Sequence, residues 1–205
     1  MSTAPARTAV PAASHGPRVS ARDRLLAAAD ELFYENGVNL VGIDRVIEHA
    51  GVAKASLYDC FGSKEELIRC YLQGRNERRQ ARVRERMAQF QAPRDKILSV
   101  FDSLAETVAR PNYHGCAFQR VGAEAGAGTS VKRTCDDSRA WLRDQFIELA
   151  RETGARDPVA LGGQLALLYD GAAVTAYLDR NPGAPQAARA VAEQLLSLVQ
   201  PGPDV

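Results

Sequence analysis

Basic and hydroxyl-bearing side chains gather in one short segment of this chain, and together they suit the binding of a polyanion. Lys54, Ser56 and Tyr58 stand at every second position, and Lys64 follows six residues after the tyrosine. Such side chains contact the phosphates of nucleic acids, and a helix N-terminus also holds a phosphate. The chemistry that these residues indicate is recognition of nucleic acid.

The segment around these residues has the pattern of two short helices joined by a tight turn. It reads GIDRVIEHAGVAKASLYDCFGSK from Gly42 to Lys64, with Gly51 at the turn, where a positive φ costs glycine little. The pattern predicts a helix-turn-helix, whose second helix enters the major groove of DNA. An ordinary helical hairpin in a core is the alternative, and the outward polar residues count against it. The apolar positions that would pack between the two helices are Val46, Ala50, Val52 and Leu57.

Helical periodicity continues through the rest of the chain, so the predicted fold class is all-α with about nine helices. We expect a disordered tail over 1–19, a helix-turn-helix DNA-binding domain over 20–66 and a ligand-binding and dimerisation domain over 67–200. A helix from 63 to about 89 is expected to connect the two domains, after a capping box at Ser63. The later helices are expected at about 94–110, 115–125, 131–153, 158–180 and 185–199.

The composition is that of a globular protein, with 45% hydrophobic and 25% charged residues. Residues 1–92 hold 14 Lys and Arg against 11 Asp and Glu, whereas residues 93–205 hold 12 against 14, so the two charges are +3 and −2. This asymmetry has the sign expected for a DNA-binding front half. Because the sequence has no signal-peptide pattern and no uninterrupted apolar run of about 18 residues, we expect a cytoplasmic protein without a membrane partner. The four cysteines lack CxxC spacing, so no zinc site and no cofactor are expected.

The N-terminal segment resembles the tetracycline-repressor (TetR) family. The resemblance covers residues 22–70, and residues 115–126 and 170–179 resemble one subfamily more weakly. It implies a homodimer with two helix-turn-helix heads, a palindromic DNA operator and a small-molecule effector that releases a repressor from that operator. The residues that carry the resemblance are Ala28, Leu32, Phe33, Gly37, Ala50-Gly51-Val52, Leu57-Tyr58, Phe61 and Ser63-Lys64-Glu65-Glu66-Leu67.

The resemblance also implies which residues contact DNA. Lys54 and Ser56 fall at exposed positions of the recognition helix, and Tyr58 falls at a position that often meets phosphate. Gly42 stands where the family commonly has threonine, so the helix cap is weaker and only the backbone can contact phosphate. Asp59 either points away from DNA or accepts a hydrogen bond from a cytosine. The full set of candidate DNA-binding residues is Gly42, Arg45, Lys54, Ala55, Ser56, Tyr58 and Lys64.

Other arginines leave two interpretations open. Arg18, Arg22 and Arg24 either reach DNA from a flexible N-terminal arm or remain solvated charges. The run from Arg75 to Arg86 alternates with glutamates, so we interpret it as the solvated face of the connecting helix in preference to a second DNA-binding patch.

The C-terminal half is expected to dimerise and to bind the ligand. Helices over about 158–180 and 185–199 are rich in apolar and small residues, and the resemblance implies that they pair with their copies in a homodimer. Two recognition helices roughly 34–36 Å apart then read successive major grooves. An apolar cavity with few polar groups is expected among the helices of 94–180. Its candidate lining residues are Phe101, His114, Cys116, Phe118, Gln119, Trp141, Tyr169, Asp170 and Tyr177.

We therefore expect a ligand-responsive DNA-binding transcriptional regulator, acting as a repressor that a small molecule releases. The alternative is a redox-responsive DNA-binding regulator that uses Cys116 and Cys135. The sequence offers no nucleophile–base pairing and no paired carboxylates in a supporting pattern, so an enzyme is not expected. The sequence leaves open the effector, the operator and the choice between repressor and activator.

Overall fold

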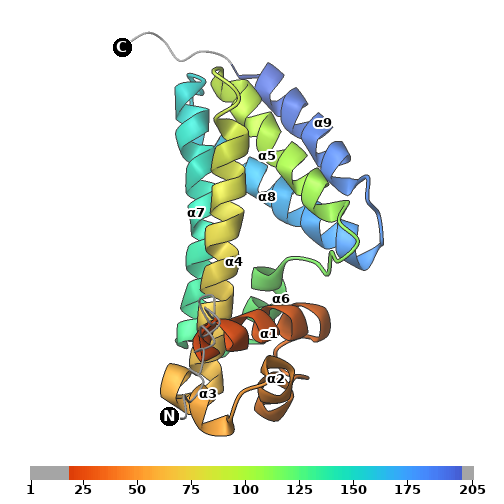
Figure 1. Ribbon diagram of the computed structural model, residues 1–205. Coiled ribbons are helices and arrows are strands. Elements are labelled where there is room, and N and C mark those ends of the chain that lie inside the picture. Colours follow the sequence, from red (N-terminus) through yellow and green to blue (C-terminus); the bar gives the residue numbers. More distant parts are fainter. Residues whose placement is uncertain (1–18, 200–205) are drawn as a thin grey trace, which may run out of the picture.

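The computed structural model describes residues 19–199, and within this range nine helices form a small head and a larger body (Figure 1). The prediction of an all-α fold with about nine helices is confirmed. Most of the predicted tail over 1–19 lies outside the described residues. The head contains α1 (Ala21–Asn36), α2 (Ile43–Ala50) and α3 (Lys54–Phe61), and α4 (Lys64–Met87) runs from it along the body. The body is completed by α5 (Pro93–Val108), α6 (Ala117–Glu124), α7 (Ser130–Glu152), α8 (Pro158–Leu178) and α9 (Ala184–Ser197).

Two serines cap α1 and α4, the helices that precede and follow the helix-turn-helix. Ser20 and Ser63 accept hydrogen bonds from backbone N–H groups three residues further along α1 and α4, each at 3.1 Å. Such caps satisfy N–H groups that the first turn of a helix leaves without a partner. The predicted capping box at Ser63 is only half formed, because the Glu66 carboxylate turns to the Arg69 guanidinium at 2.6 and 2.8 Å. A carboxylate forms a stronger hydrogen bond with a guanidinium group than with a neutral backbone N–H group.

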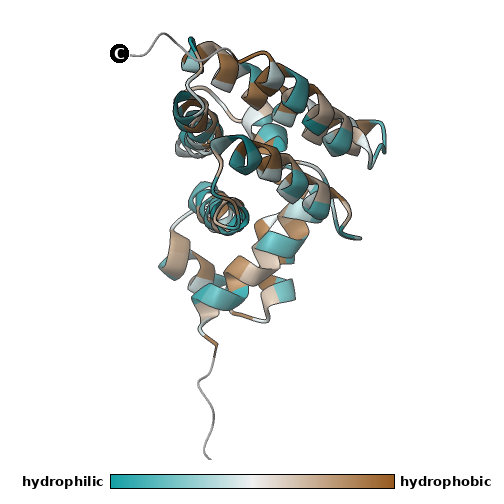
Figure 2. Cartoon of the chain, turned by 90° about the horizontal axis from the view of Figure 1, so that it is seen from above, coloured by the Kyte–Doolittle hydropathy of each residue, from teal (hydrophilic) through white to brown (hydrophobic). Residues whose placement is uncertain are grey.

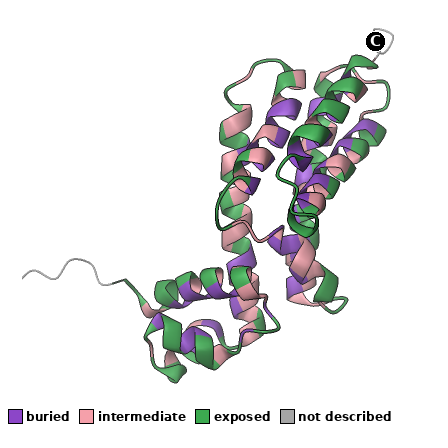
Figure 3. Cartoon of the chain, turned by 90° about the vertical axis from the view of Figure 1, so that its right-hand side faces the viewer, coloured by how far each residue is buried: buried purple, intermediate pink, exposed green. Residues whose placement is uncertain are grey.

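Two apolar clusters stabilise the described chain. The larger cluster fills the body, where Phe101 and Phe146 are fully buried and stack with 5.7 Å between ring centroids. The second cluster fills the head around residues such as Leu57, and it continues into α6 and the start of α7 through Phe118 and Cys135. Buried residues accordingly line the inward faces of both parts (Figure 3). Helix α6 is thus packed on the head through the head's own core.

Helix α8 is long and apolar enough to cross a membrane by length and composition alone. In this fold it packs against α7 and α9 and buries Leu165 and Tyr169. Helix α7 approaches it closely at Gly162, where an added Cβ would lie 2.7 Å from the backbone nitrogen of Ile147. The position of α8 in the body therefore accounts for its apolar composition.

Candidate nucleic-acid interface and ligand cavity

Helices α2 and α3 form a helix-turn-helix that is braced by α1. Val46 of α2 and Leu57 of α3 are fully buried in the core of the head. Between the helices, Gly51 adopts a left-handed conformation with φ 61° and ψ 43°, which glycine reaches without strain. The Arg24 guanidinium donates a hydrogen bond to the Gly51 carbonyl at 3.0 Å. The turn is therefore tied to α1, and this fixes the angle at which α3 is presented.

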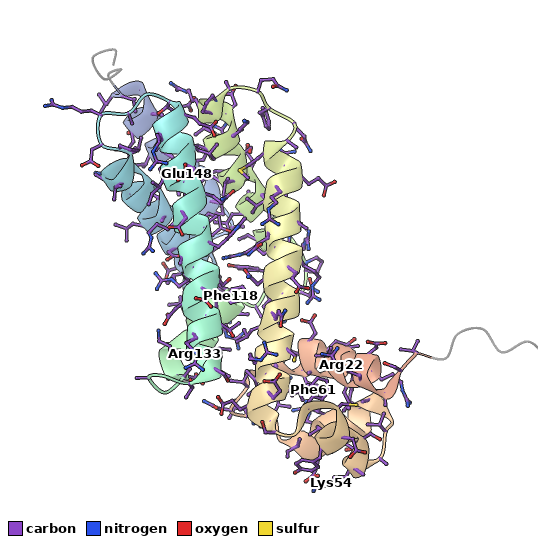
Figure 4. The ribbon with its side chains drawn as sticks, turned by 90° about the vertical axis from the view of Figure 1, so that its left-hand side faces the viewer. Arg22, Lys54, Phe61, Phe118, Arg133 and Glu148 are labelled. Atoms are coloured by element: carbon purple, nitrogen blue, oxygen red, sulfur yellow. The ribbon has the colours of Figure 1, made fainter. Side chains whose placement is uncertain are left out.

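Lys54 occupies the first position of α3, at the end of the head that points away from the body (Figure 4). Its ammonium group lies 2.9 Å from the Asp44 carboxylate of α2, and this hydrogen bond raises the pKa of Lys54. Both side chains are solvent-exposed, so a surface pair of this kind exchanges partners at little cost. A phosphate or a base edge that meets Lys54 must compete with Asp44, a neighbour that the sequence interpretation did not consider.

The remaining candidate DNA contacts differ in exposure. Tyr58 exposes 44% of its surface, whereas Ser56 is half-buried and so less accessible than the sequence analysis expected. Gly42 begins α2 without a side-chain cap, as a glycine must. The other exposed members of the candidate set are Gly42, Arg45, Lys54 and Ala55.

Lys64 is half-buried at the first position of α4, and burial lowers its pKa. The N-terminal end of a helix carries a partial positive charge and free N–H groups that favour anions. Two glutamates follow in the first turn, but each already has a partner. Glu65 accepts from the Ser130 hydroxyl at 2.7 Å, and Glu66 pairs with Arg69. Arg69 thus neutralises Glu66, whereas the neutral Ser130 hydroxyl leaves the charge of Glu65 in place. The N-terminal end of α4 offers a phosphate Lys64 and backbone N–H groups beside one uncompensated carboxylate.

Arg22 and Arg24 lie within α1, so the interpretation that they extend from a flexible arm is wrong. The Arg22 guanidinium lies 5.3 Å from the centroid of the Phe61 ring, and both side chains appear in the head in Figure 4. Arg24 binds the turn at Gly51. These two arginines stabilise the head because they join α1 to α3 and to the turn. Arg18 lies outside the described residues.

A cavity of about 100 Å³ lies where α1, α4, α5, α6 and α8 meet. Among the predicted ligand residues, Cys116, Phe118 and Tyr169 line it. Phe118 lies at the level where α4 and α7 run alongside each other (Figure 4). Tyr34 of α1 also lines the cavity, so it is bounded by the head as well as by the body.

The other six predicted ligand residues lie outside this cavity. Gln119 and Asp170 line a separate open groove between α6, α7 and α8. Tyr177 lines a shallow pocket at the end of α8. Phe101 is fully buried in the core of the body, where it has no access to a ligand. His114 and Trp141, like Phe101, line none of these three spaces.

Sequence reasoning missed four residues of α4 that line the cavity. Their assignment to a solvated face of the connecting helix is wrong for Arg75, Arg79 and Arg82, which are half-buried where α4 faces α5, α6 and α8. The assignment holds for Arg78, whose side chain stays 55% exposed at the edge of the cavity. Helix α4 is one of the two helices seen end-on in Figure 2, and its sequence is mostly hydrophilic, so composition alone did not distinguish its two faces. Their spacing of three and four residues is the available signal, since such positions share one face of a helix. The four residues are Arg75, Arg78, Arg79 and Arg82.

Tyr34 joins the head to the cavity wall through several contacts. Its hydroxyl donates to the Gly115 carbonyl at 3.0 Å and accepts from the His114 N–H at 3.1 Å. The Arg75 guanidinium lies 3.5 Å from the centroid of the Tyr34 ring. Arg120 of α6 donates to the carbonyls of both Tyr34 and His114 at 2.8 Å. A displacement of α6 or of the segment before it would therefore reach α1 directly.

The cysteines have the environment of packed thiols. Cys116 and Cys135 are not disulfide-bonded, and burial raises the pKa of both thiols, that of Cys135 to about 11. A redox-sensing cysteine needs the opposite shift, because the thiolate is the reactive form. These pKa shifts do not favour the redox-responsive alternative. Within residues 19–199, no group of three His, Cys, Asp or Glu side chains could hold a metal ion.

Comparisons with known proteins agree with this geometry. Residues 25–69 match the sequence profile described as "Bacterial regulatory proteins, tetR family". The chain is similar to SCO4454, a TetR-family transcriptional regulator from Streptomyces coelicolor, with 32% identity, a TM-score of 0.82 and coverage of 87% of this chain and 95% of that one. A TetR transcriptional regulator from Chloroflexus aurantiacus shares the fold, with a TM-score of 0.78, 19% identity and coverage of 87% and 95%.

A curated relative matches the head alone. The HTH-type transcriptional activator FasR of Mycolicibacterium smegmatis is 44% identical over 57 residues, which are 28% of this chain and 26% of FasR. The chain therefore aligns with about a quarter of the length of this activator.

Proposed function

We propose that this chain, which belongs to the tetR family of bacterial regulatory proteins, is a transcriptional repressor that a small molecule releases from a palindromic operator. Family membership makes it a DNA-binding transcriptional regulator and not an enzyme. Beyond family membership, we propose that the chain represses transcription, responds to a small-molecule effector, forms a homodimer and is cytoplasmic. The proposal also divides the chain into a DNA-binding domain over 20–66 and a ligand-binding and dimerisation domain over 67–200.

One observation carries the proposal: the cavity is bounded by the head and the body together. Tyr34 of α1 lines it with residues of α4, α5, α6 and α8. Ligand sites commonly measure about 300–1,000 Å³, so a typical ligand must separate these helices to fit into about 100 Å³. Because α4 continues into the head, that separation changes the orientation of α3. A ligand that binds the reoriented state more tightly shifts the population away from the DNA-binding state.

Exposed apolar side chains on the last two helices support the homodimer. Leu167 and Leu178 of α8 expose 73% and 68% of their surface, and Leu198 at the end of α9 exposes 76%. Apolar surface of this extent is typical of an interface with another chain. Pairing of α8 and α9 with their copies would place two heads on one duplex, as successive half-sites require.

The test measures DNA binding and ligand binding on the same protein. Duplexes selected from the source genome are titrated by fluorescence anisotropy, and sedimentation gives the oligomeric state. We expect a dimer, a palindromic site and lower reporter expression from that site. Compounds that raise the melting temperature should weaken operator binding by about tenfold or more, a coupling of about 1.4 kcal/mol.

A variant at the junction tests the route of this coupling. Tyr34→Phe removes the hydroxyl that contacts the 114–115 segment and leaves the ring beneath Arg75. We expect it to keep the thermal stabilisation by ligand and to lose most of the effect on operator affinity. Tyr113→Phe is the matched control: Tyr113 lines the same cavity, but its hydroxyl donates to a carbonyl of α8 within the body, so this variant should keep the effect of ligand on operator affinity. A monomer, a ligand without effect on DNA, or activation of the reporter would contradict the respective part of the proposal.

A further inference from the structure

Arg82 of α4 lines the cavity without a counter-charge. Its Nε atom is buried and has no hydrogen-bond partner. In the described part of the chain, Arg82 forms no ion pair; nearby arginines, Arg110 foremost, oppose its positive charge, and the Tyr169 hydroxyl of α8 favours it. Burial and these positive charges lower the pKa of Arg82. An arginine remains protonated even so, which leaves a charged group facing the cavity.

The neighbouring arginines are only partly neutralised. Arg75 and Arg78 share a single carboxylate, that of Asp30 of α1, at 2.8 and 2.7 Å. Arg79 donates through one terminal nitrogen to the carbonyl of Ser138 and, at 2.9 Å, to the hydroxyl of the same residue, while its Nε atom is buried without a partner. The residues that line the cavity include four arginines and no acidic residue. With Asp30 counted, the cavity wall therefore carries a local charge of +3.

Arg75, Arg79 and Arg82 are half-buried, whereas Arg78 is exposed, so the cluster is partly withdrawn from water and its buried portions are costly unless something compensates them. Unpaired buried charges destabilise a fold, and guanidinium groups are well suited to bidentate binding of carboxylate and phosphate oxygens. The opposite walls are apolar, formed by Leu104, Phe118 and Ala173. We propose that the effector is an organic anion whose carboxylate or phosphate group binds Arg82 and Arg79 while its apolar part contacts these walls. The inference rests on the proposed function and names the chemical class of its ligand.

In this arrangement the charge of the ligand also acts on the junction between α1 and α4. Arg75 and Arg78 connect α4 to α1 of the head through Asp30, and Arg75 also stacks on Tyr34. An anion in the cavity competes with Asp30 for these guanidinium groups. Binding would therefore loosen the α1–α4 junction electrostatically, in addition to any separation of the helices by the ligand's volume.

The experiment uses simple acids as probes and the single tryptophan of the chain as the reporter. Trp141 lies 5.9 Å from the Arg79 guanidinium and 5.3 Å from that of Arg84, so its fluorescence responds when Arg79 moves. Benzoate and phenyl phosphate are titrated against the full-length protein, with benzamide as the uncharged analogue. We expect saturable changes with an acid and binding of benzamide weaker by about tenfold or more. The tighter acid identifies the carboxylate or the phosphate as the preferred group.

Two variants and a control make the test specific. Arg82→Gln should weaken acid binding by about tenfold or more, since a charged hydrogen bond is lost. Arg94→Gln is the matched control, because Arg94 pairs with Glu193 at the surface of the body and should leave acid binding unchanged. Arg82→Met should raise the melting temperature of the unliganded protein by about 2–4 °C or more, because it removes an uncompensated charge.

Several outcomes would overturn the anion site. They are equal binding of benzamide and benzoate, unchanged acid binding by Arg82→Gln, no binding of either acid at millimolar concentration, or a lower melting temperature of Arg82→Met. Operator affinity measured in parallel separates this inference from the proposed function. Acids that bind through Arg82 and leave operator affinity unchanged support the site and contradict ligand control. Release of the operator by uncharged compounds alone supports ligand control and contradicts the site.

Discussion

The substitution Lys64→Gln tests how the head is positioned on DNA. Lys64 begins α4, and its replacement removes one positive charge per protomer while Ser63 continues to cap the helix. Glutamine has about the same helix propensity as lysine, so the helix itself should be unaffected. In a dimer two phosphate contacts are lost. Phosphate contacts carry no base information, so operator and random duplexes should lose affinity alike.

The magnitude follows from counterion release. Each phosphate contact contributes about 0.9 to the slope of log affinity against log salt, so two contacts contribute about 1.8. Between about 50 and 200 mM salt, the wild-type affinity should therefore fall roughly twelvefold more than that of Lys64→Gln. The difference is largest at low salt, where counterion release is most favourable.

The assay is an anisotropy titration over that range of salt, with operator and random duplexes. Lys96→Gln is the matched control, because Lys96 lies on α5 in the body, 3.9 Å from Glu152. Lys54→Ala provides the contrast, since it should alter which operator is preferred. An unchanged salt slope for Lys64→Gln would refute the phosphate contact. Identical behaviour of the Lys64 and Lys54 variants would refute the division into positioning and base-reading residues.

Three further predictions concern the head, the body and the thiols. Asp44→Asn removes a negative charge beside Lys54. It should therefore raise the affinity for every duplex and steepen the dependence of that affinity on salt. Unchanged affinity at low salt would place Asp44 out of reach of DNA. Gly162→Ala should lower the free energy of unfolding by about 1–3 kcal/mol in thermal melts, because the added Cβ meets the backbone of α7. Gly163→Ala is the control, since its Cβ would enter open space and should not lower stability. Equal melting temperatures of the two variants would contradict the close packing. Near pH 8, the Cys135 thiol with its pKa of about 11 should alkylate roughly a hundredfold more slowly than an ordinary thiol, and rapid labelling would revive the redox alternative.

The local parts of this structure were predictable from the sequence. The helix-turn-helix depends on short-range signals: Gly51 at the turn, apolar residues at helical spacing such as Val46 and Leu57, and the serine before α4. These signals act within a few residues, so they determine helix boundaries and the fold class without knowledge of distant contacts. The family resemblance rests on the same segment.

The cavity was decided by tertiary contacts. Arg75 to Arg82 form a charged helical stretch whose composition is the same whether a face meets solvent or a cavity, and only the packing of α5, α6 and α8 distinguishes the two. The same holds for Phe101, which the packing of α5 against α7 buries in the core and not in the cavity. The sequence by itself determined the all-α fold class and the DNA-binding head, because their signals are local. The junction at Tyr34 joins residues about 80 positions apart in the chain. The charge of the cavity depends on arginines of α4 and on Asp30, which lies 45 positions before Arg75, and only the folded structure brings these residues together.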